Sequence, residues 1–98
     1  MKLLELFTAI KDEDLTKDQL EDYHKEMSEY KAKIHLELGS IKKQRAMFEI
    51  ADPAKSVAQS RREWQGTELG QREIELKAML SATGTHLSSL KSRLFSVY

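Results

Sequence analysis

Six side chains in the middle third of the chain have the chemistry to bind a nucleic-acid strand. They are Lys42, Lys43, Arg45, Arg61, Arg62 and Trp64. Lysine and arginine bind phosphates, and an aromatic ring stacks on an unpaired base whatever its identity. This combination predicts single-stranded nucleic-acid binding. The alternative interpretation is that the bases flank a hydrophobic seam and that Trp64 fills the core near a helix turn.

The charge is unevenly distributed although the net charge of the 98 residues is zero. Residues 1–30 carry nine acids and four bases, whereas residues 31–62 carry eight bases and three acids. Such a pattern indicates either an anion-binding patch in the middle third or an acidic helical segment lying beside a basic one.

The acidic first third supports a hypothesis from another class, a protein-binding inhibitor. Its carboxylates are those of Asp12, Glu13, Asp14, Asp18, Glu21 and Asp22. A small acidic helical surface can occupy a site meant for nucleic acid by presenting complementary charge. A phage protein that blocks a host defence complex, as anti-CRISPR proteins do, would use these side chains.

Catalytic and metal-ligating patterns are weak in this sequence. Glu21 and His24 have the spacing of one half of a di-iron motif, which needs a second copy and two further carboxylates. The chain has no cysteine, no Gly-x-Ser-x-Gly elbow and no phosphate-binding glycine loop. We therefore expect a protein that is not an enzyme, with no cofactor, no metal and no small-molecule substrate.

Apolar spacing predicts helices throughout. A short helix is expected over residues 2–11, followed by a break at 12–16 where Thr16 and Gln19 form a capping box. A long helix follows over 17–51, with a bend or loose turn expected at Gly39-Ser40. Asp52 and Pro53 predict a turn over 51–54, with Asp52 capping the next helix.

Beyond that turn, helices are expected over residues 54–64 and 67–96, interrupted near Gln65-Gly66-Thr67. The heptad spacing of apolar residues marks the surfaces by which the helices pack. We expect this interface to contain Leu20, Met27, Ile34, Ile41, Phe48, Leu76, Leu80, Leu87, Leu90 and Leu94. The prediction is one all-α domain over residues 1–98, a short N-terminal helix followed by a long helical hairpin or coiled coil.

The narrow core of such a chain favours self-association, so a homo-oligomer is expected. The spacing leaves open whether the long helices pair within one chain or between chains. No apolar run reaches membrane-spanning length, and the first residues are too soon interrupted by charge for a signal peptide. A soluble, cytoplasmic protein without a membrane partner is expected, in the bacterial host cytoplasm if a phage encodes it.

Residues 16–82 resemble the UvsY recombination mediators of tailed phages, small helical oligomers that load a recombinase onto single-stranded DNA. The likeness lies in four short stretches, Tyr30-Lys31, Ser40-Ile41-Lys42-Lys43, Glu63-Trp64-Gln65-Gly66 and Glu73-x-x-Leu76-Lys77-x-x-Leu80-Ser81-Ala82. The resemblance implies that Lys42, Lys43, Arg45, Arg61 and Arg62 contact DNA phosphates. The further helical sequence by which that family assembles has no counterpart here, which leaves an oligomeric ring open.

The tripeptide Trp64-Gln65-Gly66 also resembles the Trp-x-Gly turn of the secreted WXG proteins, which are helical hairpins of similar length. Here the tripeptide lies well after Pro53 rather than at the middle of the hairpin. The tyrosine-and-acid secretion signal of that family is missing. We rank this hypothesis below the recombination mediator and the inhibitor.

Overall fold

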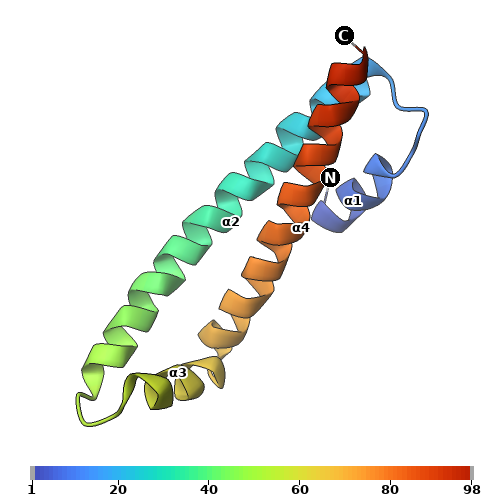
Figure 1. Cartoon of the computed structure of the whole chain (residues 1–98). Helices are drawn as coiled ribbons and strands as arrows, with labels where there is room; N and C mark the ends of the chain where they lie inside the picture. Colours follow the sequence, from blue (N-terminus) through green and yellow to red (C-terminus); the bar gives the residue numbers. More distant parts are fainter. Residues whose placement is uncertain (1, 98) are drawn as a thin grey trace. The chain divides into compact units, whose positions relative to one another are not determined.

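The computed structural model describes residues 2–97, the last of them by its backbone alone, and all regular structure within that range is helical. The helices are α1 (Leu3–Ile10), α2 (Lys17–Ala51), α3 (Val57–Gln65) and α4 (Glu68–Val97) (Figure 1). The predicted all-α fold, with a short N-terminal helix followed by a long helical hairpin, is confirmed.

The chain forms two compact units, and α2 and α4 each contribute to both. Unit 1 contains α1, the part of α2 up to Lys33 and the part of α4 from Leu80 onward. Unit 2 is Ile34–Met79 and contains the rest of α2, all of α3 and the start of α4. In each unit, the stretches of α2 and α4 lie side by side and run antiparallel (Figure 1).

The heptad residues form the core of the two units. Six of the ten predicted interface residues are buried, namely Leu20, Met27, Ile34, Ile41, Leu76 and Leu90. The remaining four, Phe48, Leu80, Leu87 and Leu94, are half-buried. Each large apolar side chain that leaves water contributes roughly 1.5–3 kcal/mol, so these contacts stabilise the chain's own helix packing. The six buried side chains are therefore not available for contact with a second chain.

Unit 1 holds α1 by its apolar face and by its C-terminal end. Leu3, Leu6 and Ile10 of α1 are buried, and the ring of Phe7 stacks on that of His86 at a centroid distance of 4.4 Å. The last carbonyl groups of any helix lack partners within the helix. In this unit the guanidinium group of Arg93, on α4, donates to the backbone oxygen of Ile10 over 2.7 Å.

The helix starts agree with the sequence at one site and differ at another. The predicted capping box is present before α2, because the Thr16 amide donates to Gln19 Oε1 and the Gln19 amide donates to Thr16 Oγ1. The prediction that Asp52 caps the following helix is wrong. Its carboxylate accepts the Ala54 amide within the turn, and Ser56 caps α3 by accepting the Gln59 amide.

Helix α2 continues through its glycine, whereas the helical structure is interrupted at the glycine between α3 and α4. Of the bend or loose turn expected at Gly39 and Ser40, the loose turn is wrong, because α2 continues through both residues. Leu38 and Ile41 on either side are buried within unit 2. The predicted interruption near Gly66 is present between α3 and α4. A Cβ at Gly70 would overlap the Trp64 carbonyl oxygen, so only glycine permits this close approach.

Candidate nucleic-acid interface

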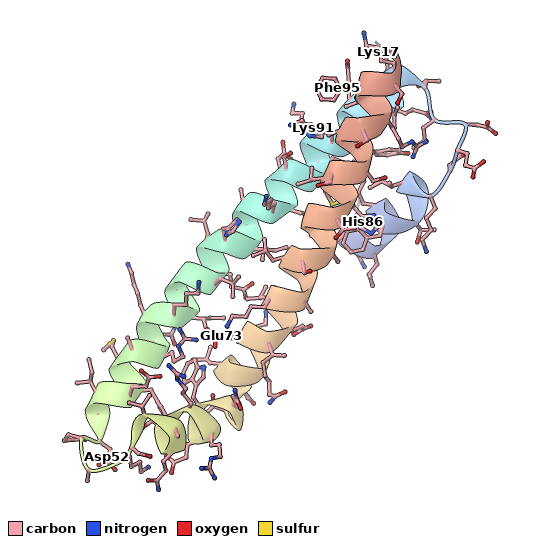
Figure 2. The ribbon with its side chains drawn as sticks, in the orientation of Figure 1. Lys17, Asp52, Glu73, His86, Lys91 and Phe95 are labelled. Atoms are coloured by element: carbon pink, nitrogen blue, oxygen red, sulfur yellow. The ribbon has the colours of Figure 1, made fainter. Side chains whose placement is uncertain are left out.

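The centre of unit 2 is a hydrogen-bonded cluster around the carboxylate of Glu73, which is only 4% exposed. Arg45, on α2, donates from Nη1 to both carboxylate oxygens, over 3.0 and 2.8 Å. Trp64, on α3, donates from Nε1 to Glu73 Oε1 over 3.3 Å. Figure 2 shows Glu73 on α4. The side chain thus joins all three helices of the unit, and burial of its charge is compensated by the arginine.

This cluster corrects one prediction and changes another. Trp64 is 4% exposed and its ring tilts against that of Phe48 at 5.6 Å, so it fills the core and offers no face to a nucleic-acid base. The prediction of base stacking by Trp64 is therefore wrong, and the alternative of a core tryptophan describes its place. Arg45 is half-buried, and its guanidinium group already has an anionic partner.

A hollow of about 430 Å³ opens beside this cluster, and we call it the basic hollow. Lys42 of α2, Arg61 of α3 and Lys77 of α4 line it, with Arg45, Trp64 and Glu73 among its other lining residues. One further acid, Glu49, also lines it. Helices α2, α3 and α4 each contribute one cation to this hollow, although the three residues are far apart in the sequence.

Ion pairing determines which charges of unit 2 remain available. Unit 2 contains eight Lys and Arg residues and seven Asp and Glu residues. Five of the acids pair with only three bases, which are Arg45, Lys55 and Arg72. Within this described unit, the groups without an ion-pair partner are the bases Lys42, Lys43, Arg61, Arg62 and Lys77 and the acids Glu49 and Glu68. An excess of positive charge therefore faces solvent.

Four of the five bases predicted to contact phosphate are exposed and lack an ion-pair partner, but they do not all lie in one place. Lys42 and Arg61 line the basic hollow, whereas Lys43 and Arg62 do not. Sequence reasoning did not assign Lys77 to the phosphate-binding residues, although it lies in one of the stretches that resemble the UvsY family. The sequence feature that could have identified Lys77 is its position directly after Leu76, which places a positive charge beside the helix-packing seam.

The paired cations of unit 2 strengthen the local structure instead. The hydrogen bond from Lys55 to Glu63 raises the pKa of the lysine, and hydrogen bonds to Glu37 and Glu75 raise the pKa of Arg72. Arg72 donates to the two Glu37 carboxylate oxygens over 3.1 and 3.0 Å, which fastens α4 to α2. The carboxylates of these pairs are exposed to solvent, which screens the attraction, so each pair adds little to stability.

The acidic residues of the alternative site lie in unit 1, in the turn after α1 and the first turns of α2. All six carboxylates, Asp12, Glu13, Asp14, Asp18, Glu21 and Asp22, belong to exposed residues. The turn is anchored, because Arg93 Nη2 donates to the Asp12 backbone oxygen and Asp12 Oδ1 accepts the Asp14 amide. Hydrogen bonds therefore fix the backbone of the turn that carries Asp12, Glu13 and Asp14.

Metal-ligand clusters and membrane-spanning helices are both lacking among residues 2–97. No group of three or more His, Asp or Glu side chains there is arranged to hold a metal ion. His86 is occupied by its stacking on Phe7 (Figure 2 labels the histidine). In the same range, no helix combines the length and the apolar character that crossing a bilayer requires.

Comparison of the chain with protein-family models, with curated proteins and with solved structures found no significant match. The resemblance to the UvsY family therefore stays a prediction. The basic hollow and the exposed surfaces are the features of this chain that bear on its function.

Proposed function

We propose that this protein binds single-stranded nucleic acid without catalysis, by holding phosphates in and around the basic hollow of unit 2. The observation that carries the proposal is that Lys42, Arg61 and Lys77, from three different helices, line one hollow and have no carboxylate partner. Lysine and arginine at such a site attract consecutive phosphates and release their counterions.

The burial of Trp64 supports recognition of the strand's backbone over its bases. Trp64 is among the residues that line the hollow, but it is only 4% exposed and its ring tilts against Phe48, so little of the ring is open to a base. Binding then depends on the sugar-phosphate backbone and shows little base preference. Lys43 and Arg62, which are exposed elsewhere on unit 2, add weaker long-range attraction.

The role as a recombination mediator follows from the resemblance of residues 16–82 to the UvsY family. In that role the protein would hold a strand extended for a recombinase. It is tested by adding the protein to a phage recombinase on single-stranded DNA covered by single-strand-binding protein. Faster filament formation supports the role, and an unchanged rate removes it while leaving nucleic-acid binding intact.

Binding itself is tested by fluorescence anisotropy with a labelled thymidine oligonucleotide at low salt. Arg61→Glu should weaken binding at least tenfold, because it replaces an attraction in the hollow by a repulsion. Lys25→Glu is the matched control, since it makes the same charge change on the exposed surface of unit 1. Equal losses in the two variants, or no binding by the wild type, would contradict the proposal.

A second candidate function rests on the exposed acidic surface of unit 1. Its six carboxylates lie on an anchored turn and the start of α2, which suits a partner protein with a basic, nucleic-acid-binding surface. Inhibition of a host defence complex is then expected. Reversing Asp18 and Asp22 to lysine should abolish capture of such a complex from bacterial lysate and leave oligonucleotide binding at least as strong.

A further inference from the structure

Unit 2 carries an exposed apolar stripe on the side of α2 that faces away from the core. Leu36, Met47 and Ile50 are 77%, 71% and 76% exposed, whereas Ile34 and Ile41 of the same helix are buried. Three large apolar side chains on one short stretch of helix are costly to leave in water. The stripe therefore has the character of an interface.

The spacing of the stripe is that of a second helix-packing seam. Five residues of α2 are spaced alternately by four and by three positions, which keeps them on one face of the helix. They are Leu36, Ser40, Lys43, Met47 and Ile50. This seam lies opposite the core seam through Ile34 and Ile41, and nothing within the described chain covers its three exposed apolar members.

Gly39 gives an independent reason to expect a helix against this face. Glycine destabilises the interior of a helix, yet Gly39 lies in the middle of the 35 residues of α2. A Cβ built there meets no atom within 4 Å, so packing inside the chain does not require a glycine. A second helix that approaches closely does require a small residue at that edge.

We propose that a second copy of this chain packs antiparallel against the α2 stripe, in the register that places Leu36 opposite Met47 of the second copy. In an antiparallel pair every contact occurs twice about a twofold axis. The same register places Lys43 opposite Ser40 of the second copy, so the two lysines do not oppose each other. The seam then consists of two apolar layers around two polar ones, and Ile50 lies beyond them, opposite Lys33 of the second copy.

The edges of this arrangement are also self-complementary. Gly39 lies near Ala46 of the second copy, so both residues at that edge are small and the helices approach closely. At the other edge Glu37 lies near Gln44 of the second copy, which avoids a pair of like charges. This match of the stripe to itself is the reason to choose a second copy over an unrelated protein.

The interface is separate from the basic hollow, and of the bases proposed to attract the strand only Lys43 lies in the stripe. Lys42, Arg61 and Lys77 are not part of the stripe, so a dimer leaves their side chains available. The buried heptad residues, including Leu20 and Leu76, take no part either. Self-association is thus assigned to a different face of α2 from the one that the leucine spacing first indicates.

The oligomeric state is tested by sedimentation and light scattering over a range of concentrations. The wild type should approach twice the chain mass of 11.3 kDa. Leu36→Asp combined with Met47→Asp should remain at the mass of one chain with unchanged helicity. Leu4→Asp is the matched control, because Leu4 is equally exposed but lies in unit 1. A wild type that stays monomeric, or a double variant that still dimerises, overturns the proposal.

The register is tested by disulfide trapping, for which the absence of cysteine from the chain is convenient. An equal mixture of Leu36→Cys and Met47→Cys chains should form the mixed disulfide faster than either variant forms a disulfide with itself. In the proposed register, position 36 of one copy would be about 16 Å along the seam from position 36 of the other. Cross-linking of Leu36→Cys with itself at the same rate as the mixture would contradict the register.

Gly39→Leu separates close helix packing from the chain's own folding. No atom lies within 4 Å of a Cβ at Gly39, and leucine is a better helix former than glycine, so the variant should keep its helicity and the stability of the single chain should not fall. It should dissociate at concentrations at which the wild type is dimeric. If the variant dimerises as strongly as the wild type, the helices do not approach closely at Gly39 and the assigned interface is wrong. This conclusion does not depend on whether the protein binds oligonucleotides.

Discussion

Arg45 and Glu73 are joined across 28 residues of sequence by hydrogen bonds of 3.0 and 2.8 Å from one guanidinium nitrogen to both carboxylate oxygens. This contact fastens α4 to α2 in unit 2, and Trp64 of α3 completes it. Every buried side-chain nitrogen and oxygen atom in the described residues has a hydrogen-bond partner. The cluster is therefore a satisfied structural centre beside the basic hollow.

Replacement of Glu73 by alanine should destabilise the protein by about 2 kcal/mol, because it leaves the half-buried Arg45 and the Trp64 N–H without their acceptor. Urea unfolding followed by circular dichroism measures the change. Glu37→Ala is the control, since Glu37 is exposed, unlike Glu73, and the loss of its ion pair with Arg72 should cost less than about 1 kcal/mol. Equal effects of the two substitutions would contradict the central role of Glu73.

Gly70→Ala should destabilise unit 2 by about 3 kcal/mol, because the new Cβ would overlap the Trp64 carbonyl oxygen. Gly84→Ala is the matched control on the same helix. No atom lies within 4 Å of a Cβ at Gly84, so alanine there should stabilise the protein by roughly 0.5–1 kcal/mol. Thermal unfolding of the two variants gives opposite shifts if the close contact of α3 with α4 is as described.

Arg93→Ala should loosen α1, because the Ile10 and Asp12 carbonyl oxygens lose their charged donor. The expected cost is about 1–2 kcal/mol. Amide hydrogen exchange provides the local readout, with faster exchange expected in α1 than in the α2 segment of unit 1. Lys91→Ala, two residues earlier on α4, should leave exchange in α1 unchanged. Loss of protection throughout unit 1 would contradict a local capping role.

The single tryptophan of the chain reports directly on the corrected role of Trp64. Because the ring is buried, its emission should be blue-shifted and poorly quenched by acrylamide. Saturation with a thymidine oligonucleotide should change the emission little, since no base stacks on the ring. A variant with Trp64→Phe and Leu4→Trp provides an exposed reference. Strong quenching of the wild type by the oligonucleotide would restore the stacking hypothesis.

Local patterns predicted the fold because they depend on near neighbours in sequence. The seven-residue spacing of Leu20, Met27, Ile34 and Ile41 identified the buried face of α2, and Thr16 with Gln19 marked its start. The cap of α3 was misassigned because Asp52 and Ser56 are both good caps. The backbone path through the turn after Pro53 decides between them, and spacing alone does not give that path.

The candidate site was predictable only in part, because ion pairing depends on contacts between distant segments. Lys42 and Arg61 were identified from their charge, and the structure leaves both exposed. The identity of the carboxylate that pairs with Arg45, 28 residues away, could not be read from the sequence. Trp64 was misassigned for the same reason, since its burial depends on Glu73 and Phe48.

The salt dependence of oligonucleotide binding tests the central claim most directly. Wild type and the variant with Lys42, Arg61 and Lys77 all changed to glutamine are titrated at several salt concentrations. If these three side chains bind phosphates, the slope of log K against log salt should be shallower by about 2 in the variant. The same slope in both proteins, at any affinity, would contradict the assignment of the basic hollow as the phosphate site.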